Sequence, residues 1–139
     1  MGESVDLRSR LRAALEAEES VAWAYLFGSA ARGGPFRDVD VALMILCDDQ
    51  RSLVSWGRLR ERVSERLGHP VDLVDLRAAP LTVAGPLLPE ALLLVDRAPE
   101  RRCGWEAETT SRWLDFRPLH LRYSQLRREA LGARLRRQS

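Results

Sequence analysis

The sequence contains no lysine, so all 22 of its basic residues are arginine, and it has only two cysteines and two histidines among 139 residues. Cys47 and Cys103 are far apart and form no C-x-x-C pair, which argues against a zinc site or a disulfide framework. His69 and His120 are also isolated, so we interpret them as packing or surface residues rather than metal ligands or general bases. Any chemistry must therefore come from other side chains.

Long hydrophobic runs are also missing. The runs VALMIL and ALLLV have the length of strands, well short of the roughly 20 residues that a membrane span needs. The beginning of the sequence is acidic and amphipathic, and it lacks the basic stub and apolar core of an export signal. We therefore expect no membrane segment and a cytoplasmic location.

The net charge of +2 is unevenly distributed along the chain. From Asp96 onward there are 11 arginines against 6 acidic residues, whereas the first 95 residues hold 11 arginines against 14 acids. A basic tail on an acidic body could meet nucleic acid or an acidic partner, or it could be the solvated face of a helix. The sequence leaves these alternatives open.

The hydrophobic pattern predicts alternating helices and strands. Amphipathic spacing predicts helices over residues 6–18 and 50–67. The predicted strands cover residues 21–27, 38–46, 71–76 and 91–95. Prolines and a glycine interrupt residues 77–90, which predicts a loop with at most a short helical turn. From about residue 99 we expect one or two helices, with Pro118 as a break or kink.

This order of elements predicts one domain over residues 1–139 with an α/β (α+β) fold. We expect a core over about residues 6–96, built as a small mixed sheet of about four strands with helices on one face. A C-terminal helical extension over about residues 97–139 would follow it.

Two aspartates stand at the start of the second predicted strand. Alternate side chains of a strand share a face, so Asp38 and Asp40 point the same way while Val39 and Val41 point toward a core. Two neighbouring carboxylates repel each other unless they share a proton or bind a cation. Oxygen ligands favour Mg²⁺, which completes its shell with phosphates and water. A solvated surface strand would carry the same two acids, so this pattern alone is weak.

A glycine and a serine directly follow the first predicted strand. Gly28 allows a sharp turn and the close approach of a phosphate, and Ser29 could cap a helix and add a hydrogen-bond donor. A helix start binds phosphate through its free N–H groups and its dipole. Together with the two aspartates, this turn predicts a site for magnesium and a nucleoside triphosphate. Arg32 could reach a phosphate or form a structural ion pair.

A third acid could come from the strand predicted over residues 71–76. Asp72 and Asp75 are three residues apart, so they face opposite sides of a regular strand and only one of them can join Asp38 and Asp40. We choose Asp72, because the apolar stretch after it matches the way Asp40 leads into its own strand. Asp75 remains the alternative.

The stretch GSAARGGPFRDVD resembles the motif of minimal nucleotidyltransferase (MNT) domains of the DNA polymerase β-like superfamily. That motif is Gly-Ser, a spacer, Asp-x-Asp and a third acid on a later strand, which VDLVDL supplies here. The spacer, residues 30–37, is shorter than in those domains, so the loop above the phosphate site should be tighter. The segments PVDLVDLRAAPL and SRWLDFRPLHLRY resemble MNT-type antitoxins, and the resemblance covers most of residues 20–125.

This resemblance implies a fold, a reaction and a partner. It implies a polymerase-β-like nucleotidyltransferase core that transfers AMP from ATP to a tyrosine of a HEPN-domain ribonuclease toxin and so silences the toxin. Two Mg²⁺ ions would assist. The implied catalytic and metal-binding residues are Asp38, Asp40 and Asp72, with Asp72 as the general base or its metal-bound equivalent. The implied nucleotide-binding residues are Gly28, Ser29 and Arg32.

Two alternatives remain. The chain could be an antitoxin without catalysis, which blocks its toxin by contact through the apolar and arginine-rich C-terminal part. It could also be a nucleotidyltransferase that acts on RNA or on a small molecule, and the basic tail keeps RNA open as a partner. The HEPN toxin is the partner that we expect.

Overall fold

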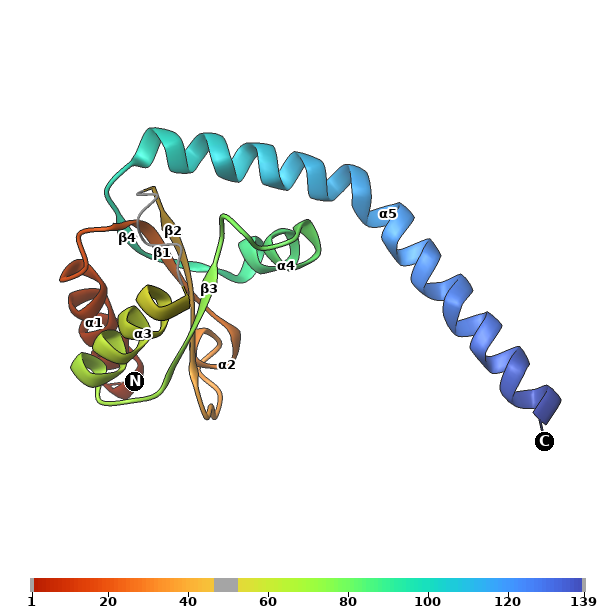
Figure 1. Cartoon of the computed structure of the whole chain (residues 1–139), viewed down its shortest axis with the longest axis horizontal. Coiled ribbons are helices and arrows are strands. Elements are labelled where there is room, and N and C mark those ends of the chain that lie inside the picture. The colour runs from red at the N-terminus through yellow and green to blue at the C-terminus, as the bar shows by residue number, and fades with distance from the viewer. Residues whose placement is uncertain (1, 47–52, 139) are drawn as a thin grey trace.

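The computed structural model describes residues 2–46 and 53–138. The elements in chain order are α1 (Gly2–Glu16), β1 (Val21–Phe27), α2 (Gly28–Ala31), β2 (Val39–Ile45), α3 (Leu53–Leu67), β3 (Val71–Asp75), α4 (Leu81–Leu87), the 3₁₀ helix η2 (Leu88–Glu90), β4 (Leu92–Asp96) and α5 (Pro99–Gln138) (Figure 1). Cys47 and the predicted start of the second long helix at residue 50 lie outside the described residues. Within the described part, no helix is both long and apolar enough to cross a membrane.

The four strands form one mixed sheet in the order β3-β2-β1-β4. β1 runs antiparallel to both β2 and β4, whereas β2 and β3 are parallel. Parallel neighbours require a crossover connection, and α3 lies in the chain between β2 and β3. The predicted four-stranded mixed sheet with helices is thereby confirmed.

The main hydrophobic core lies between the sheet and the helices α1 and α3. Alternate residues of the central strand β2 point into it, and each is fully buried: Val39, Val41, Leu43 and Ile45. The helices contribute Leu11, Leu15, Leu59, Val63 and Leu67. These leucines and valines recur at helical spacing, which is why the sequence pattern located both helices.

The opposite face of the sheet is covered in part by α4 and the beginning of α5. Trp23 and Tyr25 of β1 pack against Trp105 of α5, with ring centroids 6.0 and 6.4 Å apart. The Tyr25 hydroxyl donates a hydrogen bond of 2.5 Å to Glu106, and Arg102 pairs with Glu106 at 3.0 Å. Helices therefore cover more than the one face that the sequence predicted.

The segment predicted as a loop over residues 77–90 instead contains α4 and η2. Helix α4 includes Pro86, which cannot donate a backbone hydrogen bond. It nevertheless forms because it packs on α5: a Cβ on the buried Gly85 would overlap the indole of Trp113. Contacts between distant parts of the chain outweigh the weak local helix propensity here.

Helix α5 is one continuous helix of 40 residues. Its first part lies over the body of the protein and its second part projects away from it (Figure 1). Pro118 lies inside the helix, and Figure 1 shows that the helix changes direction part-way along. A bend is the expected result of a proline that removes one hydrogen bond from the helix interior.

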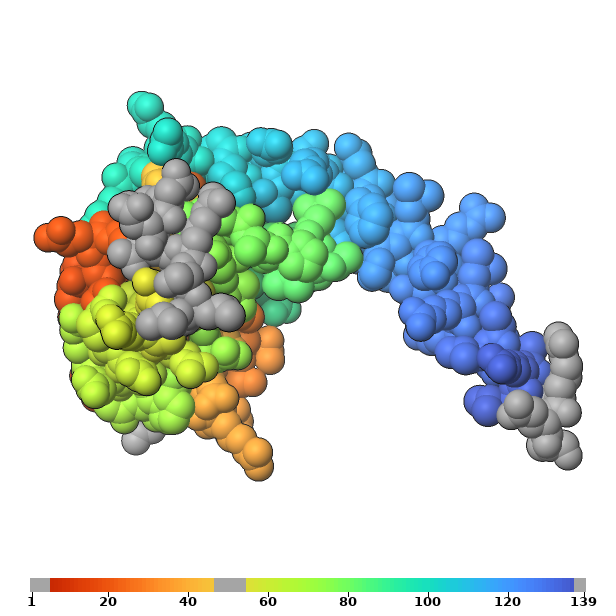
Figure 2. Space-filling model, in the orientation of Figure 1, coloured from red at the N-terminus to blue at the C-terminus, as the bar shows by residue number. Residues whose placement is uncertain are grey.

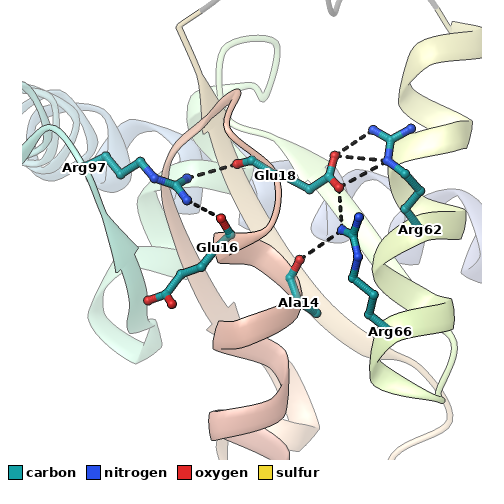
Figure 3. A network of polar contacts seen from close by, with 6 residues as sticks. All are labelled: Ala14, Glu16, Glu18, Arg62, Arg66 and Arg97. Carbon is teal, nitrogen blue, oxygen red and sulfur yellow. Dashed lines mark hydrogen bonds and ion pairs between the residues drawn. The ribbon is translucent and has the colours of Figure 1, made fainter.

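A buried carboxylate ties the connection between α1 and β1 to its neighbours (Figure 3). Glu18 is only 7% exposed, and it accepts hydrogen bonds from Arg62 at 2.7 Å and Arg66 at 2.5 Å, both on α3. On the other side of this connection, Arg97 donates to the backbone carbonyls of Glu16, Glu18 and Val21. The same short segment thus holds α3 and the end of β4 in place.

We predict that Glu18→Gln lowers the free energy of unfolding by about 1–3 kcal/mol at pH 7, because two arginines lose their charged partner. Burial by itself raises the pKa of Glu18, but the hydrogen bonds and charges of Arg62 and Arg66 outweigh it and hold the pKa below 4.5. A carboxylate with a lowered pKa stabilises the fold above its unfolded-state pKa. The difference between wild type and variant should therefore shrink as the pH falls below about 4.5. Urea unfolding at pH 7 and about pH 3 measures it.

Glu19→Gln is the matched control, because Glu19 is the neighbouring glutamate and is exposed. It should change stability by less than about 0.5 kcal/mol. Equal losses in the two variants would contradict a structural role for Glu18.

Candidate functional site

The pairing of β2 with β3 brings two of the predicted acids together. These strands are parallel, and Asp40 is the register partner of Asp72. Neighbouring partners in a sheet point to the same face, so both carboxylates lie on the side away from the main core. Asp38 immediately precedes β2 and is exposed, as is Asp72, whereas Asp40 is half-buried.

Asp75, the alternative third acid, lies elsewhere. Its register partner is Leu43, whose side chain is buried in the main core. Its carboxylate accepts a hydrogen bond from the backbone N–H of Arg77 at 3.0 Å and pairs with the Arg77 side chain at 3.5 Å. Of the two aspartates that the sequence left open, only Asp72 shares a face with Asp40.

Gly28 lies directly against Asp40. It follows Phe27, the register partner of Asp40, and its φ of 73° is in the left-handed region that favours glycine. A Cβ on Gly28 would lie 3.1 Å from Cγ of Asp40 and would overlap its Oδ2. The turn therefore needs glycine for two reasons: its backbone angle and the space that the carboxylate occupies.

Ser29 does not cap a helix, contrary to the prediction. Helix α2 already begins at Gly28, so Ser29 lies inside its first turn, and the capping position falls on Phe27, which makes no side-chain cap. The reason is that the left-handed glycine starts the turn one residue earlier than the capping rule assumes. Ser29 remains half-buried beside Gly28, and its carbonyl accepts a hydrogen bond of 3.1 Å from Gly34.

The short spacer between the Gly-Ser pair and Asp38 folds back on this turn. Besides the bond from Gly34, the N–H of Arg32 donates to the Gly28 carbonyl at 3.3 Å. Gly33 adopts a φ of 78°, which lets the chain reverse toward β2. The loop is compact because its own backbone hydrogen bonds close it.

Of the two roles that the sequence left open for Arg32, the structure shows the ion pair. Its guanidinium forms an ion pair of 3.3 Å with Glu90 of η2, and both side chains are well exposed. Arg32 is also near enough to Asp40 to lower the pKa of that carboxyl group. The sequence pattern missed Glu90, because it follows Pro89 in a segment that was predicted as loop and carries no motif.

The surroundings of Asp40 disfavour its negative charge. Burial raises the pKa of Asp40, the charges of Asp72 and Asp38 raise it further, and Arg32 opposes them. Among the described residues, no three His, Cys, Asp or Glu side chains form a ready-made metal site. The donor set is nevertheless all oxygen and in need of positive charge, which suits Mg²⁺ with additional ligands from phosphates and water. Asp38, Asp40 and Asp72 thus fit an ion that is shared with a nucleotide.

Comparison with known proteins decides the family. The family model described as polymerase beta, nucleotidyltransferase matches residues 9–100, about two thirds of the chain. The chain belongs to the polymerase β nucleotidyltransferase family. The match includes every residue of the candidate site.

Individual proteins that resemble this chain are consistent with the family assignment. The protein adenylyltransferase MntA of Shewanella oneidensis (strain MR-1) is 36% identical over 55 residues, a match that spans about 40% of each protein. A chain of the structure of the tri-AMPylated Shewanella oneidensis HEPN toxin with its MNT antitoxin aligns with a TM-score of 0.62 at 19% identity, covering 92% of this chain and 94% of the other. A toxin-antitoxin structure with AMP-PNP aligns with a TM-score of 0.61 at 20% identity, covering 89% and 94%. The structural matches show a shared fold that includes most of α5.

We predict that Asp72→Asn lowers the pKa of Asp40. The substitution removes the negative charge of Asp72, which raises this pKa more than the charge of Asp38 does. Asp75→Asn is the matched control on the same strand, and it should leave the pKa of Asp40 unchanged since Asp75 lies on the other face. NMR titration of the aspartate carboxyl carbons measures both. An equal effect of the two variants would contradict the assignment of Asp72 to the site.

We further predict that Gly28 and Asp40 are energetically coupled. Gly28→Ala and Gly33→Ala should each cost about 1–2 kcal/mol from their positive φ, but only the Cβ at position 28 meets another group, whereas the one at position 33 has nothing within 4 Å. Adding Asp40→Ala should therefore recover part of the loss in Gly28→Ala and none in Gly33→Ala. Double-mutant cycles from urea unfolding test this, and additivity in both pairs would refute it.

Proposed function

We propose that this protein is an antitoxin that transfers AMP from ATP to a tyrosine of a cognate HEPN-domain ribonuclease toxin. The observation that carries the proposal is the position of Asp40 opposite Asp72 across β2 and β3, with Gly28 directly against Asp40. The relatives support it: MntA is a protein adenylyltransferase, and similar folds occur in complexes with an AMPylated HEPN toxin and with AMP-PNP.

Each part of the site has a role in this reaction. Gly28 leaves room for the Asp40 carboxylate beside the turn, and the backbone of Gly28 and Ser29 would lie close to the triphosphate. Asp38, Asp40 and Asp72 would hold Mg²⁺ ions, which when bound offset the charge of the phosphates and lower the pKa of a nearby hydroxyl group. Asp40 is half-buried between the turn and β3, whereas Asp38 and Asp72 are exposed and can reach an ion from the solvent side.

The chemical step is a substitution at the α-phosphorus. The tyrosine oxygen forms a bond to this phosphorus while the bond to the bridging oxygen of the β-phosphate breaks, and pyrophosphate leaves. Asp72 accepts the proton of the tyrosine hydroxyl, because it is exposed and lies opposite Asp40 on the same face of the sheet. Backbone N–H groups beside Ser29 and the guanidinium of Arg32 stabilise the leaving phosphates.

Arg32 must exchange partners to do this. Its ion pair with Glu90 is exposed on both sides, and exposed pairs contribute only about 0–1 kcal/mol. A triphosphate offers more negative charge than one carboxylate, so Arg32 can leave Glu90 at little cost when the nucleotide binds.

A second candidate is an antitoxin that neutralises its toxin by contact alone. The observation that favours it is the projecting second part of α5, which carries exposed apolar side chains. The two functions differ in whether the aspartates are needed, so one set of variants separates them.

We predict that the chain, incubated with labelled ATP, Mg²⁺ and the HEPN-domain protein encoded beside its gene, transfers the label to that protein. Asp40→Asn and Asp72→Asn should reduce the transfer by about 10²–10⁴-fold, as expected for loss of groups that act on the reacting atoms. Asp75→Asn should retain it. Mass spectrometry of the product then identifies the acceptor, which we expect to be a tyrosine.

A different outcome would contradict the catalytic proposal. If no label moves, while chains with Asp38→Ala and Asp40→Ala still neutralise the toxin, the catalytic proposal fails and the antitoxin acts by contact. Label that appears on added RNA rather than on the protein would favour RNA as the acceptor.

A further inference from the structure

The second part of α5 exposes an unusual amount of apolar surface. We call residues 114–136 the arm. Eight of the eleven large hydrophobic side chains that are exposed in the described residues lie on it: Leu114, Phe116, Leu119, Leu121, Tyr123, Leu126, Leu131 and Leu135. Leu119 is 67% exposed and Tyr123 is 65% exposed. Side chains of this kind on a projecting helix mark a surface that another molecule covers.

Four of these side chains follow the spacing of a helix-packing stripe. Phe116, Leu119, Tyr123 and Leu126 are separated by three, four and three residues, and we call them the seam. Ala130 and Ala133 continue the same spacing toward the C-terminus. A 3-4 repeat of apolar residues is the pattern by which one helix packs along another. The seam therefore fits a helical surface on its partner.

By helical spacing the seam continues the side of α5 that packs on the body. Tyr123 follows Trp105 by 18 residues, which is about five helical turns, and Trp105 is the residue that packs on Trp23 and Tyr25. Figure 2 shows the arm curving away from the body, with an open hollow between the two. A partner bound on the seam would occupy this hollow.

The candidate site opens on the same side of the sheet. Asp40 alternates along β2 with core residues, so it shares a face with Ala42 and Met44. Those two residues pack in the cluster that Leu87 and Trp105 cover from α4 and α5. A molecule held between the arm and the body is thus beside the face that carries Asp40 and Asp72.

The charge of the arm selects the kind of partner. It carries six arginines against two acidic residues, Asp115 and Glu129. Two arms would repel each other, whereas a surface edged by carboxylates would be attracted. Charge complementarity therefore favours an acidic protein over a second copy of this chain.

We propose that the seam is the docking surface for the HEPN-domain partner, which would bind it with an apolar helical surface edged by acidic residues. The identity of the partner rests on the proposed function. The arm is a binding element and does not touch the reacting atoms. It presents the partner to the carboxylates, so loss of the seam should weaken docking and leave the chemical step intact.

The test compares two triple variants of matched exposure. The seam variant combines Leu119→Ser, Tyr123→Ser and Leu126→Ser, and the control combines Leu114→Ser, Leu121→Ser and Leu135→Ser on the opposite side of the helix. Calorimetry with the HEPN-domain protein encoded beside this gene should show an affinity about 100-fold weaker or more for the seam variant. The control should stay within about threefold of wild type. Circular dichroism verifies that both remain helical.

Kinetics separate docking from chemistry. In AMP transfer the seam variant should raise the KM for the toxin and leave kcat within about threefold at saturating toxin. Asp40→Asn should do the reverse, binding the toxin normally while losing transfer. Seam-dependent binding without any AMP transfer by wild type would leave this proposal standing and refute the proposed function.

Three results would overturn the docking proposal. The first is wild-type affinity of the seam variant for the toxin, and the second is an equal loss in the control variant. The third is sedimentation of the chain alone as a dimer that the seam variant abolishes, since this would assign the seam to a second copy.

Discussion

The central strand β2 is the constraint on which both the core and the site depend. It pairs with β1 on one side and β3 on the other, and its alternate residues Val39, Val41, Leu43 and Ile45 fill the main core. A shift of one residue would turn Asp40 into that core and the valines toward solvent. The burial of four apolar side chains therefore holds Asp40 in register with Asp72.

The proximity of Asp38 and Asp72 to Asp40 is electrostatically unfavourable. Burial and the charges of Asp72 and Asp38 raise the pKa of Asp40, so ionised Asp40 is less favourable here than an isolated, exposed carboxylate would be. Gly28 adds a positive φ and leaves a space that the Asp40 carboxylate enters. Local strain and like charges gathered at one position are typical of functional sites.

Different helices cover the two faces of the sheet. On one face α1 and α3 close the main core, and Glu18 with its arginines fastens the connection between α1 and β1 to α3. On the other face α4 and the beginning of α5 cover Trp23 and Tyr25 but not the end that carries Asp40. Because α5 continues as the arm, the same helix that covers this face also projects away from the body (Figure 1).

The sequence by itself determined the features that depend on local pattern. Strand β1 was predicted with its observed bounds, and Gly28, Asp38 and Asp40 were located, because alternation and glycine turns are properties of neighbouring residues. The sequence favoured Asp72 over Asp75, but only the tertiary structure shows which of them lies opposite Asp40, since that depends on the pairing of β2 with β3. It also decided that α4 is helical, that Ser29 is no cap and that Arg32 meets Glu90. The helix α4 and the Arg32–Glu90 pair come from contacts between residues far apart in the chain, and the start of α2 comes from the left-handed conformation of Gly28, so local propensity does not contain this information.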